Sequence, residues 1–359
     1  MTDYQVFDLG DVQLQSGRTS ANTQLAYKTY GELAADKSNV IVCPTPFGGR
    51  HINLEPSILP GRPLDPTKYF IVVINMFGNG LSTSPSHLPG HLPQPLDPTQ
   101  VPQFTIYDNV MAQHRLLAEV FGVEHIAMVY GRSMGAIQAF HWGALFPDQV
   151  ARICCICGAA RPSPHNQLFL QGLKATLTLD SNWRPGQNAG GDIGGGNNVD
   201  NCGWFDATPE RGLAAMARVY AGWALSQGFY REEAWRSLGY ASVEEFVVER
   251  WEGFLKKSNA NDILAMLWSW QHADISANDL YQGDFSAALG AIRAKALVMP
   301  CETDLYFRVE DNRREVAQMP NASLLPIPSI WGHMAGSYPE GVVDSNFIDA
   351  AVFDLLASN

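Results

Sequence analysis

Six short runs of almost unbroken apolar residues are the feature that most restricts how this chain of 359 residues can fold. Such runs are typical of strands covered on both faces, and the stretch 109–121 between two of them carries apolar residues at helical spacing. Strands that alternate with helices predict a mostly parallel sheet with flanking helices. The runs are NVIVCPT (39–45), YFIVVINM (69–76), HIAMVY (125–130), ARICCIC (151–157), KALVMPC (295–301) and SLLPIPS (323–329).

The pattern changes at two places along the chain. Residues 4–15 and 25–30 alternate polar and apolar side chains, which predicts an antiparallel hairpin at the edge of the sheet. After Pro162 the strand pattern stops, and helical stretches rich in Trp, Ala and Leu follow, for example 212–226 and 263–273. We therefore expect a core built from residues 1–161 and 287–359, with a helical lid inserted at 162–286.

The third apolar run leads directly into GRSMG (131–135), and the helical stretch AIQAFHWGALFP follows it. A strand, a sharp turn and a helix around a G-x-S-x-G pattern form the nucleophile elbow of the α/β-hydrolase fold. Gly131 and Gly135 leave room where the strand and the helix pack closely. The helix N-terminus stabilises negative charge that develops near Ser133. The sequence therefore predicts an α/β-hydrolase fold with Ser133 as the nucleophile.

A serine hydroxyl needs a base to take its proton and a third group to orient that base. In this fold the chain order is Ser, acid, His. His333 alone among nine histidines follows the last predicted strand and precedes the predicted terminal helix 346–356. The acid is expected just beyond the preceding strand, where Asp304 is the first choice and Glu302 the alternative. Asp304 could also be an ordinary helix cap or loop carboxylate.

An oxyanion needs backbone N–H donors, one from the residue after the nucleophile and one from the loop after an early strand. The first donor is predicted to be Met134. The loop is CPTPFGGRH (43–51), in which Pro46 has no N–H to donate. We therefore expect Phe47 to be the second donor, with Thr45 as the alternative.

Composition and charge exclude several classes of partner. The 36 acidic and 24 basic side chains give a formal net charge of −12, which repels nucleic acid and anionic membranes. No apolar run approaches the roughly 20 residues that cross a bilayer, and the N-terminal residues lack the basic and apolar regions of a signal peptide. These features predict a cytoplasmic protein that acts on a small-molecule acyl substrate.

Two further patterns are interpreted as structural. Cys154 and Cys157 form a C-x-x-C, but neighbouring strand residues face opposite sides, and no second pair of Cys or His stands at zinc-ligand spacing. We therefore expect a buried strand, no metal site and no resident cofactor. The Gly-rich segment 186–204 follows no strand and lacks both phosphate-loop patterns, so it is interpreted as a mobile surface loop.

With these parts assigned, the chain resembles the homoserine O-acetyltransferase-like family of α/β-hydrolases over nearly its whole length. Position by position, the resemblance implies Ser133 as nucleophile, Asp304 as acid and His333 as base, and it implies a homodimer formed through the lid. The similar segments are GRSMGAIQAFHW (131–142), FGNGLSTSPS (77–86), FTIYDNVMAQHRLL (104–117), DLYFRVEDNRREVAQMPNASL (304–324) and the GH of 332–333.

The substrate-binding positions depart from that family. Met334 stands where the homoserine enzymes have an Asp suited to a substrate ammonium, and Lys174 appears where they have an arginine for the carboxylate. Pro46 alters the oxyanion loop. Arg132 replaces a glycine of the elbow and could face a substrate anion or form a structural salt bridge. These departures predict a divergent member that does not bind an amino acid by both of its charges.

Three functions fit these residues. The first is a hydrolase that passes the acyl group of an ester or amide from Ser133 to water. The second is an O-acetyltransferase that uses acetyl-CoA as co-substrate and acetylates a small alcohol such as homoserine or serine. The third is a non-catalytic binding protein, which the complete Ser, Asp and His set disfavours. Met334 and Lys174 favour the hydrolase.

The helical insertion carries several tryptophans that could line the acyl pocket or contact a second subunit. Most are interpreted as core residues. They are Trp223, Trp235, Trp251, Trp268 and Trp270.

Overall fold

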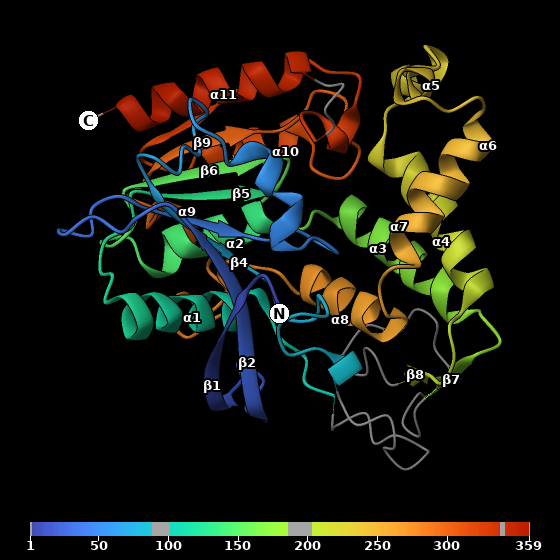
Figure 1. Cartoon of the computed structure of the whole chain (residues 1–359), viewed down its shortest axis with the longest axis horizontal. Coiled ribbons are helices and arrows are strands. Elements are labelled where there is room, and N and C mark those ends of the chain that lie inside the picture. Colours follow the sequence, from blue (N-terminus) through green and yellow to red (C-terminus); the bar gives the residue numbers. More distant parts are fainter. Residues whose placement is uncertain (1, 88–100, 186–202, 338–341, 359) are drawn as a thin grey trace.

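The computed structural model describes residues 2–87, 101–185, 203–337 and 342–358. Its centre is an eight-stranded sheet in the order β1-β2-β4-β3-β5-β6-β9-β10 (Figure 1). The pairs from β4 to β10 are parallel, whereas β2 is antiparallel to both β1 and β4. The strands are β1 (Gln5–Gln13), β2 (Thr19–Tyr30), β3 (Val40–Pro44), β4 (Phe70–Ile74), β5 (Met128–Arg132), β6 (Arg152–Ile156), β9 (Lys295–Met299) and β10 (Ala322–Leu324).

Helices cover both faces of this sheet, as the continuous apolar runs predict. In β3, Val40 and Val42 belong to one buried cluster, while Ile41 and Cys43 belong to a second cluster on the other face. Residues of α1 and α2 complete the first cluster, and residues of α11 complete the second. The core helices are α1 (Ile106–Leu116), α2 (Met134–Leu145), α9 (Phe285–Gly290), α10 (Val309–Val316) and α11 (Val342–Ala357).

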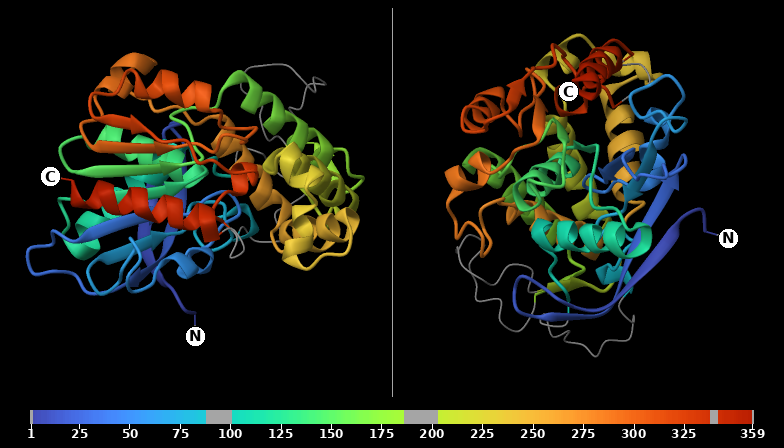
Figure 2. Two further views of the ribbon diagram at one scale, coloured as in Figure 1. Left: turned by 90° about the horizontal axis from the view of Figure 1, so that it is seen from above. Right: turned by 90° about the vertical axis from the view of Figure 1, so that its left-hand side faces the viewer.

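A second group of helices lies between β6 and β9 in the chain. Figure 2 shows α3 to α7 gathered beyond one end of the sheet. A small two-stranded sheet, β7 (Trp183–Pro185) with β8 (Gly203–Phe205), belongs to the same part of the chain. The helices are α3 (Pro164–Thr178), α4 (Glu210–Ala224), α5 (Gln227–Arg231), α6 (Val243–Phe246), α7 (Gly253–Leu255) and α8 (Ala260–Gln271).

The predicted elements agree with the observed ones except at β5, which begins at Met128 and continues to Arg132, and at the last strand. The N-terminal hairpin is present as β1 and β2, and all six apolar runs contribute a strand to the main sheet. The apolar run 323–329 is a strand only at its start, because β10 ends at Leu324 and an isolated bridge between Ile327 and Cys301 follows. Pro326 and Pro328 have no N–H to donate, which prevents a regular ladder.

Two other predictions concern segments that are only partly described. Most of the Gly-rich segment, 186–202, lies outside the described residues. Within the residues that the structure describes, no helix has both the length and the apolar character required to cross a membrane.

Candidate active site

Ser133 lies on a sharp turn between β5 and α2. Its φ of 54° and ψ of −125° are unusual for a residue with a side chain, and such strain is held by the surrounding packing. A Cβ on Gly131 would lie 2.1 Å from the carbonyl oxygen of Gly135, and a Cβ on Gly135 would lie 2.5 Å from that of Pro44. The two glycines are therefore required by close backbone contact, as the sequence predicts.

The structure brings Ser133, His333 and Asp304 together from three separate parts of the chain. His333 Nε2 lies 2.9 Å from Ser133 Oγ, and His333 Nδ1 lies 2.9 Å from Asp304 Oδ2. All three side chains are buried. A proton on Nδ1 leaves Nε2 free to accept the serine proton, which is the arrangement that activates a serine nucleophile.

Asp304 is held by the backbone that follows it. Its Oδ1 accepts hydrogen bonds from the N–H groups of Tyr306, at 2.8 Å, and Phe307, at 3.2 Å, which leaves Oδ2 for His333. Glu302, the alternative acid, has an exposed side chain. The geometry therefore favours Asp304 over Glu302 as the residue that orients the imidazole.

Arg132 connects the elbow to the loop that carries His333. Its Nη2 donates to the carbonyl oxygen of His333 at 2.9 Å and also to that of Ala335. The guanidinium therefore donates hydrogen bonds to main-chain carbonyl oxygens, which favours a structural role over contact with a substrate anion. The hydrogen-bond partners of Arg132 are carbonyl groups, so these contacts are not the salt bridge that the sequence analysis considered.

The oxyanion loop leaves one of its two candidate N–H groups available. The N–H of Thr45 donates to the carbonyl oxygen of Ile74 at 3.0 Å, so Thr45, the second choice, is already used. The hydrogen bonds between described residues leave the N–H of Phe47 unused. Met134 is the first residue of α2, so its N–H has no partner within the helix.

Aromatic rings from the segment after Asp304 lie against His333, and rings from the insertion pack behind them. The Tyr306 ring lies 4.3 Å from the His333 ring and stacks on Phe169 at 4.7 Å between centroids. Trp270 is fully buried and stacks on Phe307, whose ring also faces His333. Of the other predicted tryptophans, Trp235 and Trp251 are buried, whereas Trp223 and Trp268 are partly exposed.

Met334 and Lys174, which the sequence analysis predicts at substrate-binding positions, lie in different settings. Met334 follows His333 in a short helical turn, is partly buried and packs against the main hydrophobic cluster. Lys174 lies in α3 and is partly exposed, next to the buried Leu173.

One residue beside the site was missed by the sequence analysis. Cys157, interpreted as part of a buried strand, lies just beyond β6, and its Sγ lies within 4.8 Å of ligand atoms of Asp304 and His333. Burial, and then the nearby Asp304 carboxylate, raise the pKa of the Cys157 thiol well above its usual value. The thiol is therefore neutral near pH 7, which makes it a poor metal ligand. The spacing Cys154 to Cys157 carries no signal for this placement.

The fold and the elbow define an α/β-hydrolase, and comparison with known proteins gives the same result. Residues 39–186 match the family model described as the alpha/beta hydrolase fold. The chain is 36% identical to a probable esterase of Corynebacterium glutamicum, over 92% of this chain and 89% of that protein. It is 35% identical to an ethyl acetate hydrolase of Pseudomonas veronii, over 99% and 96%. The chain therefore belongs to the α/β-hydrolase family.

Solved structures and more distant relatives define the branch within that family. The structure of the acetyl esterase MekB superposes with a TM-score of 0.87 at 34% identity, covering 99% of this chain and 97% of that one. A homoserine O-acetyltransferase of Caulobacter vibrioides is 28% identical over 97% of this chain and 92% of that protein. The resemblance to the homoserine O-acetyltransferase-like family is thus confirmed, and the chain is an acyl-transfer enzyme of the serine hydrolase or O-acyltransferase type.

Proposed function

We propose that this protein hydrolyses acetyl and other short-chain esters of small alcohols through an acyl-enzyme on Ser133. The observation that carries the proposal is the unbroken hydrogen-bonded chain from Asp304 through His333 to Ser133. The names of two relatives, an ethyl acetate hydrolase and an acetyl esterase, support the acyl group. Aromatic rings packed close to His333 support a small acyl pocket.

In the first half of the reaction, Ser133 Oγ attacks the ester carbonyl carbon while His333 Nε2 takes the hydroxyl proton. Asp304 holds the imidazole and stabilises its positive charge. The carbonyl oxygen becomes an oxyanion that the N–H groups of Met134 and Phe47 stabilise. When the carbon–oxygen bond to the alcohol breaks, His333 returns the proton to the departing alkoxide oxygen, and an acyl-Ser133 ester remains.

In the second half, a water molecule replaces the alcohol. His333 takes a proton from the water, whose oxygen attacks the acyl carbon and forms a second oxyanion at the same donors. The bond to Ser133 Oγ then breaks, and His333 returns the proton to the serine oxygen. The products are the carboxylic acid and free enzyme, and no resident cofactor or metal takes part.

The alternative is an O-acetyltransferase, in which acetyl-CoA forms the acyl-enzyme and an alcohol replaces water. The likeness to a homoserine O-acetyltransferase is the observation that favours it. Met334, a neutral thioether, cannot pair with a substrate ammonium, which supports the hydrolase instead.

The experiment that separates the two functions follows both products. Acid release from ethyl acetate is titrated, and thiol release from acetyl-CoA is measured with and without homoserine, serine and simple alcohols. We expect rapid acid release and slow thiol release that no alcohol stimulates. Thiol release that depends on an added alcohol, together with O-acetyl product, would establish the transferase.

A fluorophosphonate probe tests whether the site is catalytic at all. It reacts with an activated serine, so it is expected to label the wild type and to leave Ser133→Ala unlabelled. An unlabelled wild type that hydrolyses no ester would support a non-catalytic binding protein on this fold.

A cytoplasmic location and a homodimer formed through the insertion are further parts of the proposal. The five cysteines in the described part of the chain are free thiols, which is compatible with a reducing compartment. Leu168 and Leu179, at α3 and its end, are exposed to 63% and 78%, and an apolar contact would bury them. Light scattering tests the dimer, and Leu168→Lys with Leu179→Lys is expected to yield monomers.

A further inference from the structure

Three polar side chains form a hydrogen-bonded chain inside the otherwise apolar contact between α1 and α2. Gln113 lies on α1, Gln138 and Trp142 lie on α2, and all three are fully buried. Trp142 Nε1 donates to Gln113 Oε1 at 2.8 Å, and Gln113 Nε2 donates to Gln138 Oε1 at 2.6 Å. Gln138 Nε2 donates in turn to the carbonyl oxygens of Thr45, at 3.0 Å, and Met134, at 3.2 Å.

The direction of this chain is determined by its first member. An indole N–H can only donate, so the Gln113 side chain must turn its oxygen towards Trp142. The amide nitrogen of Gln113 then faces Gln138, which must accept with its own oxygen. The amide nitrogen of Gln138 is left to point at the two main-chain carbonyl groups. Trp142 therefore sets the orientation of an amide that it does not touch.

The two carbonyl groups belong to the segments that carry the proposed oxyanion donors. Met134 supplies one of the N–H groups. Thr45 lies two residues before Phe47, which supplies the other. The bond from Gln138 to Thr45 joins the loop after β3 to helix α2, and thus to the elbow that carries Ser133.

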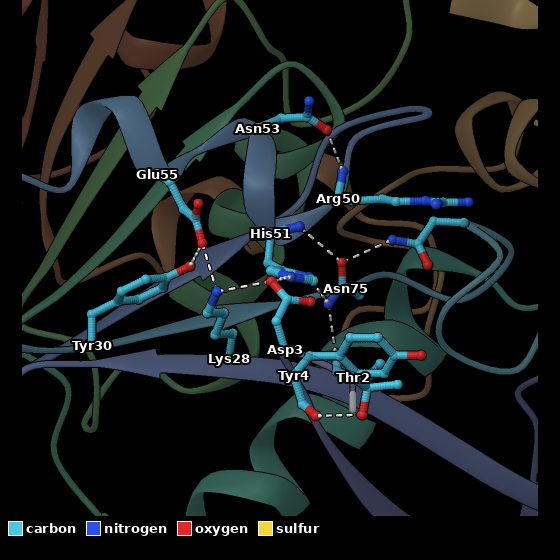
Figure 3. Close-up of polar contacts among 12 residues, drawn as sticks. Thr2, Asp3, Tyr4, Lys28, Tyr30, Arg50, His51, Asn53, Glu55 and Asn75 are labelled. Carbon is cyan, nitrogen blue, oxygen red and sulfur yellow. Dashed lines mark hydrogen bonds and ion pairs between the residues drawn. The ribbon is translucent and has the colours of Figure 1, made fainter. Parts of the chain in front are cut away.

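The far end of the same loop is held by a separate set of contacts. The N–H of His51 donates to Asn75 Oδ1 at 3.0 Å, and Asn79 Nδ2 donates to the carbonyl oxygen of Gly49 at 3.0 Å. Figure 3 shows Asn75 beside His51, whose Nε2 lies 3.2 Å from Asp3 Oδ2, and Asp3 also pairs with Lys28. Phe47 lies between the two anchors, so its N–H is positioned by the anchor at each end.

A buried amide is a costly way to fill space in a protein core. It needs a partner for each polar atom, whereas an apolar side chain of the same volume needs none. The three side chains pair the amide atoms of Gln113 and Gln138 with one another, with Trp142 and with Thr45. Removal of one of these side chains therefore leaves polar atoms of the others without a partner.

We propose that Gln138 is a positioning residue that sets the spacing between the two oxyanion donors, and that Gln113 and Trp142 fix the orientation of its amide. This inference rests on the proposed function, in which the N–H groups of Met134 and Phe47 stabilise the oxyanion. Gln138 touches neither the substrate nor the reacting atoms. Its effect is therefore expected in transition-state stabilisation and not in substrate binding.

The test compares kcat, KM and inhibition by a short-chain trifluoromethyl ketone in Gln138→Met and in the wild type. The ketone forms a tetrahedral adduct on serine whose oxygen occupies the oxyanion hole. Loss of one oxyanion donor lowers kcat by about 100-fold or more, so a misplaced donor is expected to lower it by about 10- to 100-fold. KM is expected to stay within about twofold, and ketone affinity to fall by the same factor as kcat.

Phe140→Leu is the matched control, because Phe140 is also fully buried on α2 but takes no part in the polar chain. It is expected to lower the melting temperature while kcat and ketone affinity stay at the wild-type level. A folded Gln138→Met with wild-type kcat and ketone affinity overturns the inference. Equal loss of kcat in Phe140→Leu and Gln138→Met at equal loss of melting temperature also overturns it, because general loosening of α2 would then explain both.

If Gln138→Met does not fold, Trp142→Phe tests the positioning role of Gln138 instead. The indole N–H of Trp142 donates to Gln113 and not to either oxyanion segment, so the substitution removes the donor that orients the Gln113 amide. A decrease in kcat of about threefold or more at constant KM supports the inference, and an unchanged kcat overturns it. If the wild type is active and binds the ketone, and the variants behave like it, the positioning role is contradicted but the proposed function is not. Wild type that neither hydrolyses esters nor binds the ketone contradicts the proposed function instead.

Discussion

The two sides of Ser133 are built in different ways. On the sheet side, directional hydrogen bonds join the acid, the base and the elbow: Asp304 Oδ2 pairs with His333 Nδ1, and Arg132 donates to the carbonyl oxygen of His333. On the side that faces the insertion, Phe169 of the insertion stacks on Tyr306 of the core, and the Tyr306 ring lies beside His333. Hydrogen bonds fix angles as well as distances, whereas ring packing mainly fills volume.

This difference predicts a division of labour within the site. Changes on the sheet side should reduce kcat, because they misalign groups that act in the transition state. Changes on the insertion side should instead alter which acyl groups fit, because they change the shape of an apolar wall. The following variants test that division, beginning with the largest expected effect.

Asp304→Asn should reduce kcat by about 1,000- to 10,000-fold, because an amide no longer fixes the proton on Nδ1 of His333. KM for ethyl acetate is expected to change little. Acid titration across a range of substrate concentrations measures both constants. Glu302→Gln is the control and should behave as wild type, since its side chain is exposed. If kcat falls by less than about tenfold in Asp304→Asn, another group orients His333, and Glu302 is the first candidate.

Arg132→Met removes the guanidinium that holds the loop of His333. We expect kcat to fall by about 10- to 100-fold, because small misplacements of a catalytic group have effects of this size. Arg152→Met is a matched control, since Arg152 also donates from a strand to two main-chain carbonyl oxygens, those of Leu355 and Ser358. Arg152 is the first residue of β6, at the end opposite to Ile156, which pairs with Arg132. The kcat of Arg152→Met should be unchanged. Equal effects of the two variants on kcat would mean that Arg132 acts only through general stability.

Phe169→Leu should change acyl selectivity more than rate. A smaller side chain beside Tyr306 leaves space for longer acyl chains, and one methylene in an apolar pocket is worth about 10-fold or more in selectivity. We expect the ratio of kcat/KM for butyrate over acetate esters to rise by about 3- to 10-fold. Phe246→Leu is the control, because Phe246 is fully buried in the insertion and packs on Phe229 and Tyr240. The division of labour fails if Phe169→Leu lowers kcat for acetate without changing the ratio.

The smallest effect on activity is expected from His141, which lies on α2. Burial lowers the pKa of His141 from its usual 6.5 to about 4. The unfolded chain therefore binds a proton near pH 6.5, while the folded protein resists it until about pH 4, so stability falls as the pH decreases through this window. By linkage the loss approaches about 3 kcal/mol.

His141→Phe should flatten this pH dependence without changing kcat at neutral pH. Thermal unfolding followed from pH 8 to pH 4 is the measurement. A pH dependence that is the same in the variant and the wild type would show that other groups control acid stability.

Much of the core was predictable because its signals are local. These signals are the apolar runs, the glycines around Ser133 and the missing N–H of Pro46 in the oxyanion loop. Each depends on backbone and side-chain properties of a few neighbouring residues. The placement of Cys157 beside the site was not predictable, because its neighbours Asp304 and His333 lie far along the chain. β10 is shorter than its apolar run because Pro326 and Pro328 have no N–H to donate to a ladder.

The sequence alone determined the fold family, the nucleophile elbow and the order of the acid and the base, because strand, turn and helix preferences are properties of short segments. Only the tertiary structure decided that Thr45 is unavailable as a donor, that Arg132 supports the loop of His333, and that Gln138 joins the two oxyanion segments. Each of these facts depends on which groups become hydrogen-bond partners after distant segments pack together. A polar side chain in the sequence has many possible partners, and the packed structure selects among them.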